Sequence, residues 1–217
     1  MTVIRTDEIL ARLRTADFKK RLVLSPLLNE EEQAKPGQAA VDMRLGFDFC
    51  LVTASSFGSI SEFPKEEGQP HSFSKLYRRE YVPFGSSIVI HPHQFMLAQT
   101  LEYIRLPDDL MAYVVGRSTW GRLGLIVATA IGIHPGFAGC LTLELRNLGE
   151  TPLTLFPGQT VAQLFFHSVS GKKNKIKAPL EAQYSGSVDM VPKKISSNKT
   201  HDILEKLIDR FKSSSSI

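Results

Sequence analysis

The sequence has few cysteines and no long apolar run. Its 217 residues include 2 cysteines, Cys50 and Cys140, which lie far apart and form no C-x-x-C pair. This excludes a disulfide scaffold and a cysteine-based structural zinc site. No run of 18 apolar residues occurs, and charges recur every few positions from Met1 to Leu13, so we expect neither a membrane-spanning helix nor a secretory signal. The expected setting is the cytoplasm.

The charge is only weakly one-sided, with a net value of +4, and its distribution is uneven. Residues 171–217 hold 10 Lys and Arg against 5 Asp and Glu, whereas residues 1–170 hold 16 against 17. We therefore expect a near-neutral globular domain at 1–170 and a basic C-terminal segment at 171–217 that ends in a short amphipathic helix. The basic residues of the tail are not interleaved with a series of aromatics, so we expect no nucleic-acid partner.

Short β-type runs separated by Gly and Pro dominate from about Val41 to Phe166, whereas Thr6–Leu13 reads as a short helix with a threonine cap. The clearest strand is Cys140–Arg146. Its period-2 alternation puts three leucines on one face and Thr142, Glu144 and Arg146 on the other, which directs a carboxylate away from the core. This spacing favours an all-β barrel or sandwich over a β-α-β fold.

Several signatures of known chemistry are missing. No G-K-[S/T] follows the clustered glycines, no G-x-S-x-G elbow occurs, and the H-x-E…P-C-x-x-C signature of zinc nucleobase deaminases is absent. His91 and His93 form the only close histidine pair, and no Asp, Glu or Cys nearby completes a metal-binding set. We therefore interpret this pair as polar residues of a turn.

The segment Gly116–Leu125 combines two arginines, two hydroxyl side chains and three glycines after an apolar run. Glycines permit close backbone approach to a ligand, and guanidinium groups bind phosphate in a bidentate manner. The alternative is a solvated loop whose glycines serve turns. The next segment, Ala128–Gly139, is equally consistent with a ligand-lining hairpin and with an ordinary β-turn.

A series of ordered motifs is spread over residues 40–164, more than half of the chain. They are Ala40–Gly46, Leu97–Tyr103, Leu106–Asp109, Gly116–Ser118, Arg122–Leu125, Pro135–Gly139, Thr142–Asn147 and Pro157–Leu164. Together they resemble the dCTP deaminase branch of the dUTPase-like superfamily. The resemblance implies a mainly β, dUTPase-like barrel or jelly-roll-type core with a short N-terminal helix and a C-terminal helical extension. It also implies a homotrimer with nucleotide sites at its subunit interfaces, Mg²⁺ bound with the triphosphate, and deamination without zinc.

The resemblance assigns roles to individual residues. Glu144 takes the place of the catalytic glutamate, which acts as general base on a water that attacks C4 of cytosine. Arg122 and Ser118 match the residues that help to hold the reacting centre and the water. The other substrate-binding residues that it implies are Arg117, Thr119, Ala130, His134, Thr142, Leu143, Gln163 and Tyr184.

The chain departs from the family pattern at three places. His134 stands where the family usually has an aspartate that contacts the sugar 3′-hydroxyl, and Ile131-Gly132 replaces a basic pair. The closing segment keeps Tyr184 and loses its lysine. A neutral imidazole has at most one hydrogen-bond acceptor, whereas both oxygens of a carboxylate are acceptors. We therefore expect weaker recognition of the sugar 3′-hydroxyl and a lower chance of a second, dUTPase-like activity.

The main hypothesis is hydrolytic deamination of dCTP, or a related cytidine nucleotide, to dUTP and ammonia. One alternative keeps the fold but hydrolyses a nucleotide to pyrophosphate, or forms dUMP in a bifunctional reaction. Another is a nucleotide-binding regulatory protein whose turnover is lost or altered because of His134.

Overall fold

The computed structural model describes residues 2–52, 76–129, 132–170 and 206. Spatial contacts divide the chain into two compact units, and the first comprises residues 1–52 and 79–190. The fold of this first unit positions the predicted site. The predicted division at residue 170 falls where the described core ends, so it stays a prediction, as does the helix after Thr200.

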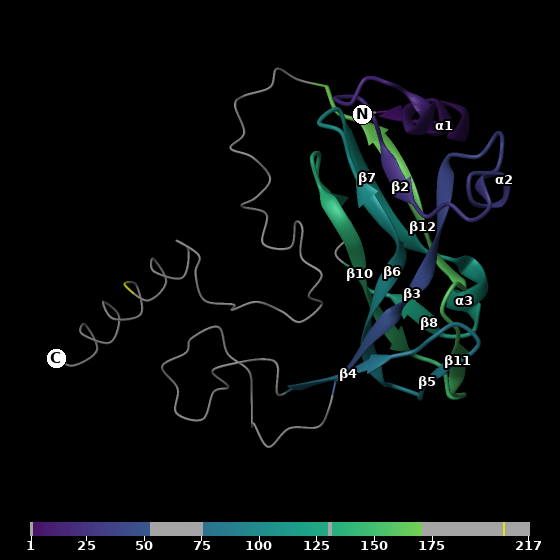
Figure 1. The fold of residues 1–217 in the computed structure, drawn as a ribbon. Helices are drawn as coiled ribbons and strands as arrows, with labels where there is room; N and C mark the ends of the chain where they lie inside the picture. The colour runs from purple at the N-terminus through teal and green to yellow at the C-terminus, as the bar shows by residue number, and fades with distance from the viewer. Residues whose placement is uncertain (1, 53–75, 130–131, 171–205, 207–217) are drawn as a thin grey trace. The chain divides into compact units, whose positions relative to one another are not determined.

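Strands are the predominant secondary structure of this unit (Figure 1). The helices and strands are β1 (Thr2–Val3), α1 (Thr6–Arg14), β2 (Val23–Ser25), α2 (Glu30–Gln33), β3 (Ala40–Val52), β4 (Tyr77–Tyr81), β5 (Ile88–Ile90), β6 (Phe95–Arg105), β7 (Leu110–Gly116), α3 (Ser118–Arg122), β8 (Leu125–Val127), β9 (Gly132–Ile133), β10 (Ala138–Asn147), β11 (Leu153–Leu155) and β12 (Thr160–Ser168).

The main sheet runs in the order β8-β10-β6-β3-β12-β7-β9, with β1 beside β12 and β2 beside β6. Strands β8 and β9 follow each other in the chain but lie at opposite ends of this order, so the sheet curls on itself. The ends of β7 and β8 lie close together at Gly116 and Val127. A Cβ added at Gly116 would be 3.3 Å from Cγ2 of Val127. A second, two-stranded sheet pairs β11 with β5. The mainly β, barrel-type architecture expected from the sequence is confirmed.

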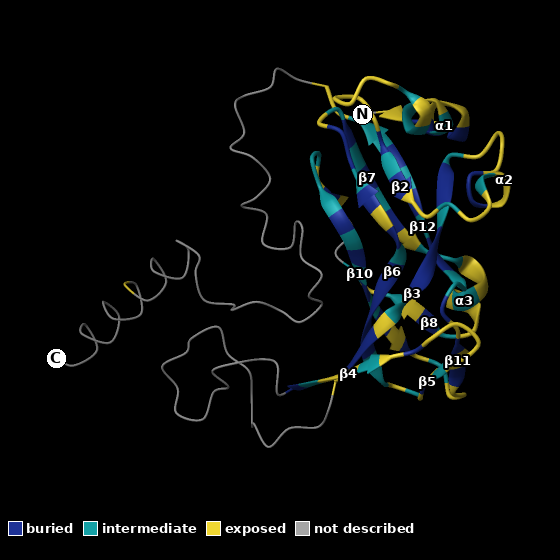
Figure 2. Ribbon diagram, in the orientation of Figure 1, coloured by how far each residue is buried: buried dark blue, intermediate teal, exposed yellow. Residues whose placement is uncertain are grey.

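Burial alternates residue by residue along β7 and β10, whereas β3 and β6 are buried along most of their length, as the dark blue of β3 shows (Figure 2). In β10, Leu141, Leu143 and Leu145 are buried, whereas Thr142 and Glu144 on the other face are partly exposed. The orientation expected for this strand is therefore confirmed. The side chains with the greatest volume among the fully buried ones are Phe49 and Phe166, from β3 and β12.

Helix α1 forms at the expected residues, but the predicted cap is wrong. The N-cap position is Arg5, without a side-chain hydrogen bond, and Thr6 is the first helical residue. The hydroxyl of Thr6 donates instead to the carbonyls of Lys35 and Gln38, at 2.9 and 3.1 Å. Thr6 is buried, and these two bonds to the segment after α2 satisfy its hydroxyl group. The residues around Thr6 do not reveal these partners, which lie about 30 positions away in the chain. In the part of the chain that the structure describes, no helix is both long and apolar enough to cross a bilayer.

Replacement of Gly124 by alanine is expected to destabilise the fold by at least ~2 kcal/mol. Gly124 has a φ of +94°, and an added Cβ would lie 2.5 Å from the backbone nitrogen of Gly149. The matched control is Gly121→Ala, because a Cβ at Gly121 meets no atom within 4 Å. In urea unfolding, the free energy of unfolding should fall strongly for Gly124→Ala and not for Gly121→Ala. Equal unfolding midpoints for the two variants would contradict this account.

Candidate active site

Glu144 lies on the less buried face of β10, next to the segment that leaves β8. Its backbone N–H donates to the hydroxyl of Thr129 at 2.9 Å, and its carbonyl accepts from the N–H of Ala128 at 2.8 Å. The chain after β8 is therefore attached to the backbone of Glu144 from both sides. Burial raises the pKa of the Glu144 carboxyl above its ordinary value, because desolvation disfavours the charged form. A carboxyl with a raised pKa holds a proton more readily than an ordinary one, which is a property of groups that both accept and release protons.

Strand β10 changes register immediately before this position. Cys140 pairs with Tyr103 of β6, but the next pair is Thr142 with Gln99, so an irregularity of the bulge type lies between them. Bulges redirect side chains and are frequent near active sites. Thr142 is partly buried, whereas the side chain of Leu143 is fully buried in the core. Only the backbone of Leu143 is thus available to line a base, as the resemblance implies.

The Gly116–Leu125 motif forms the short helix α3 and its flanks, rather than only a loop. Arg117 precedes the helix, and its N–H donates to the carbonyl of Val161 at 3.1 Å. The indole Nε1 of Trp120 donates to the carbonyl of Thr160 at 2.9 Å, which fastens α3 to the start of β12. Ser118, Thr119 and Arg122 are exposed on this helix (Figure 2). Their hydroxyl and guanidinium groups are therefore presented to solvent.

Arg117 and Gln163 converge on one carboxylate. Gln163 Nε2 donates to Oδ1 of Asp42 at 2.8 Å, and Nη1 of Arg117 forms an ion pair with Oδ2 of the same residue. Asp42 belongs to β3, Gln163 belongs to β12, and Arg117 directly follows β7; these strands lie side by side in the order β3-β12-β7. The structure thus brings together two of the predicted substrate-binding residues through a third residue.

Within one chain, the structure does not connect the predicted base Glu144 to the two residues that were expected to help hold the reacting centre. Across residues 76–129 and 132–170, no hydrogen bond or ion pair links the carboxylate of Glu144 to Ser118 or Arg122. His134 is exposed at the first position of the turn that precedes β10, where its carbonyl accepts from the N–H of Phe137 at 3.2 Å. Ala130 and Tyr184 lie outside the described residues.

Sequence reasoning assigned no role to two residues of this region. Asp42 lies in the motif Ala40–Gly46, and Thr129 lies in the segment Ala128–Gly139, so both were within quoted segments. Their contacts cross 121 and 15 positions of the chain. The only available signal was Asp42 itself, a carboxylate flanked by the apolar residues Val41 and Met43, because a carboxylate that becomes buried needs partners.

The described residues contain no group of three or more His, Cys, Asp or Glu side chains placed to hold a metal ion. Mg²⁺ commonly keeps several waters and binds through one or two carboxylates together with substrate phosphates. The donor set is therefore compatible with a magnesium ion that arrives with a triphosphate. Asp42 is the carboxylate nearest to the two phosphate-type donors, but both of its oxygens already have side-chain partners.

Comparison with known proteins gives consistent matches. A family model described as dCTP deaminase-like matches residues 4–169. The dCTP deaminase, dUMP-forming, of Methanobrevibacter smithii is 40% identical over 151 residues, which cover 69% of this chain and 74% of that protein. The dCTP deaminase of Natronomonas pharaonis is 35% identical over 178 residues, covering 79% and 84%.

Among solved structures, the 2′-deoxycytidine 5′-triphosphate deaminase of Agrobacterium tumefaciens matches with a TM-score of 0.56 and 23% identity. The match covers 77% of this chain, which spans about half (48%) of that structure. This likeness supports the fold alone. The family match and the identity to the curated relatives confirm the resemblance seen in the motifs, and the chain belongs to the dCTP deaminase-like family.

Proposed function

We propose that this protein hydrolyses dCTP to dUTP and ammonia, with Glu144 as general base. The observation that carries the proposal is the setting of Glu144 within a family whose relatives are named dCTP deaminases. It stands on the accessible face of a rigid strand, its backbone is held by Thr129, and burial raises its pKa. These features suit a carboxyl group that must accept a proton and release it again within one turnover.

The reaction needs one water and a base. The carboxylate of Glu144 takes a proton from water as the oxygen bonds to C4 of cytosine. The same carboxyl group then returns that proton to the amino group, the C4–N bond breaks and ammonia leaves. The second proton of the water passes from the new oxygen at C4 to N3, which completes the uracil ring. Ser118 and Arg122 would hold the water and the reacting centre through hydroxyl and guanidinium donors. No zinc is required in this scheme, because a positioned carboxylate deprotonates the water.

The phosphates would bind to Arg117, Gln163 and the hydroxyl groups at the start of α3. Guanidinium and amide groups donate to phosphate oxygens, and Mg²⁺ carried by the triphosphate would reduce its charge. The backbone at Thr142–Leu143 would line the base, with His134 beside the sugar. Tyr184 is a further substrate-binding residue that the resemblance implies.

A homotrimer would complete the site. Ser118 and Arg122 are exposed, and within the described part of one chain no hydrogen bond or ion pair joins them to the Glu144 carboxylate. Residues from a second subunit would complete the site. Apolar side chains next to α3 and on β8 and its neighbours are also exposed, namely Val115 at 45%, Leu123 at 55%, Ile126 at 38% and Leu148 at 54%. Such surfaces are typical of subunit interfaces. Light scattering should give three times the chain mass of 24.2 kDa.

The pH dependence follows from the raised pKa of Glu144. Because a general base acts only when deprotonated, kcat/KM is expected to increase with pH through this raised pKa. Stability should change in the opposite direction. The folded state holds the proton of the Glu144 carboxyl more tightly than the unfolded chain does. Its contribution to the free energy of unfolding is therefore present at low pH and is lost as the pH rises through the pKa of the folded state. Measurements of kcat/KM from about pH 4 to pH 9 would test this, and a flat profile would contradict the assignment.

The proposed function is tested by measuring ammonia and pyrophosphate together for dCTP, CTP, dCMP and dUTP. Ammonia from dCTP without pyrophosphate supports the reaction as stated. Pyrophosphate without ammonia would instead select a nucleotide pyrophosphohydrolase. Tight binding of dCTP without either product would indicate a regulatory protein.

A second candidate is a bifunctional enzyme that releases both ammonia and pyrophosphate and forms dUMP. The specific observation in its favour is the 40% identity to a dUMP-forming relative. The opposing observation is His134, which stands where the family pattern has an aspartate. A His134→Asp variant that gains pyrophosphate release would link the outcome to this position.

A further inference from the structure

Both carboxylate oxygens of Asp42 are engaged by side chains of predicted substrate-binding residues. Gln163 Nε2 donates to Oδ1 at 2.8 Å, and Arg117 pairs with Oδ2. Asp42 and Gln163 are direct register partners of β3 and β12, and Arg117 follows β7 on the other side of β12. Three neighbouring strands therefore converge on one carboxylate.

Asp42 is itself firmly held. Its side chain is only 13% exposed, whereas that of Arg117 is 30% exposed. Its backbone carbonyl accepts from Nε2 of Gln33 at 3.2 Å, and Gln33 also donates to the buried carboxylate of Glu102 at 3.0 Å. The acceptor is therefore the fixed partner in this group, and the long arginine side chain is the one that it restrains.

We infer that Asp42 is a positioning residue that orients Arg117 and Gln163 for the triphosphate, an inference that rests on the proposed function. A guanidinium has five N–H donors in a rigid fork, so pairing with Asp42 leaves donors available for phosphate oxygens. Restraining a long side chain before binding lowers the entropy that the ligand must overcome. This orientation acts on binding rather than on the attack at C4.

The negative charge of Asp42 has an effect of the opposite sign. A carboxylate close to a phosphate site repels the ligand, so its removal alone would strengthen binding. Orientation and repulsion therefore predict opposite changes in KM. We expect orientation to dominate, because Asp42 satisfies two donors at once and its charge is already paired with that of Arg117.

The test is Asp42→Asn. An asparagine has one acceptor oxygen and one NH₂ group, so one of the two donors loses its acceptor. The KM for dCTP is expected to rise about tenfold, which corresponds to ~1.4 kcal/mol, while kcat changes less than about twofold. An unchanged or lower KM would overturn the inference, as would a loss confined to kcat. Asp48→Asn is the matched control, since Asp48 lies on the same strand and is exposed.

Two further measurements separate this role from a structural one and from the proposed function. In an Arg117→Ala background, Asp42→Asn should raise KM much less than in the wild type, because the residue through which it acts is gone. Equal effects in both backgrounds would count against the inference. Calorimetric binding of inorganic tripolyphosphate should also weaken about tenfold in Asp42→Asn. If the wild type releases no ammonia, the proposed function fails, yet this binding comparison still decides the role of Asp42. Unchanged or absent tripolyphosphate binding would overturn it.

Discussion

Glu144→Gln is expected to lower the turnover of dCTP by about 10²- to 10⁴-fold, the range typical for loss of a positioned general base. Glutamine has nearly the same shape but cannot accept the proton of the attacking water. The backbone bond from Glu144 to Thr129 does not depend on the side chain, so the strand should keep its geometry. The loss should therefore appear in kcat, with KM for dCTP nearly unchanged. Steady-state measurement of ammonia release tests both.

The fold itself should tolerate this change. Because burial raises the pKa of Glu144, the charged carboxylate is less favoured in the folded state than in water, and a neutral amide avoids that cost at neutral pH. Thermal unfolding of Glu144→Gln should therefore show a melting temperature at or above that of the wild type. Glu150→Gln is the matched control, since Glu150 is exposed at the turn after β10 and should keep full turnover. Wild-type rates in Glu144→Gln would remove Glu144 from the mechanism.

Arg44→Met is expected to destabilise the fold by about 3–5 kcal/mol, the usual cost of leaving one member of a buried ion pair alone. Nε of Arg44 donates to Oε1 of Glu102 at 2.6 Å, and the side chains are 8% and 0% exposed. The backbone N–H of Arg44 donates to the other oxygen at 2.9 Å, and its Nη2 donates to the carbonyl of Pro26 at 2.9 Å. Loss of the guanidinium leaves the buried carboxylate with fewer donors. Urea unfolding should show the midpoint fall sharply.

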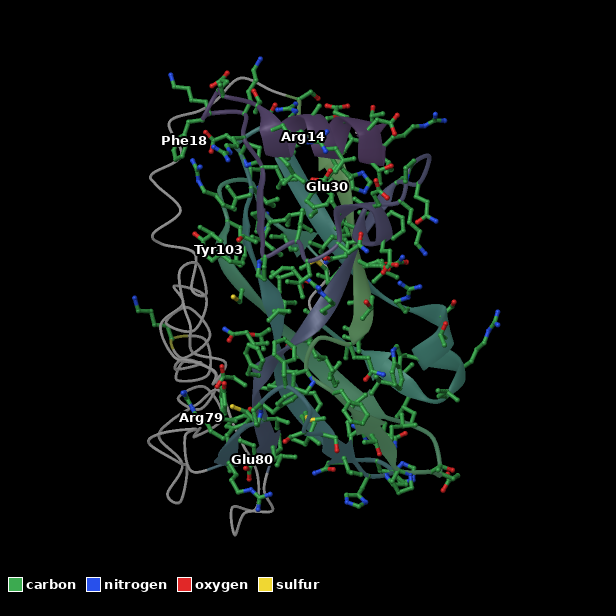
Figure 3. All side chains as sticks on the ribbon, turned by 45° about the vertical axis from the view of Figure 1, so that its right-hand side comes forward. Arg14, Phe18, Glu30, Arg79, Glu80 and Tyr103 are labelled. Atoms are coloured by element: carbon green, nitrogen blue, oxygen red, sulfur yellow. The ribbon has the colours of Figure 1, made fainter. Side chains whose placement is uncertain are left out.

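Arg14→Met is the matched control for that experiment. Arg14 and Glu30 also form an ion pair, near α1 and α2, but their side chains are 68% and 36% exposed (Figure 3). Exposed pairs contribute about 0–1 kcal/mol, because water already solvates both charges. Similar losses for Arg14→Met and Arg44→Met would show that burial does not control the strength of the Arg44–Glu102 pair.

The period-2 pattern of β10 was sufficient to place Glu144 on the accessible face. Successive side chains of a strand point to opposite faces whatever the strand pairs with, so this property is local and can be read from the residues. The same holds for the turn that His134 begins, where Gly136 has a φ of +79° as expected for a Pro-Gly turn. The ordered motifs also sufficed to identify the family.

Contacts between distant segments could not be predicted in this way. Thr6 was expected to cap α1, but its hydroxyl reaches Lys35 and Gln38, because the tertiary fold brings that segment against the helix. Asp42 meets Gln163 only because β3 and β12 are adjacent and in one particular register. A shift of one residue would turn either side chain to the opposite face, so register decides the contact.

The sequence by itself therefore determined a near-neutral, mainly β core with few cysteines, the motifs of its family and a carboxylate directed away from the interior. The tertiary structure decided which groups surround that framework. It placed Arg117 and Gln163 on Asp42, Thr129 on the backbone of Glu144, and a buried ion pair between Arg44 and Glu102. The physical reason is that alternation and turn chemistry are properties of neighbouring residues, whereas these partners depend on how non-consecutive strands pair.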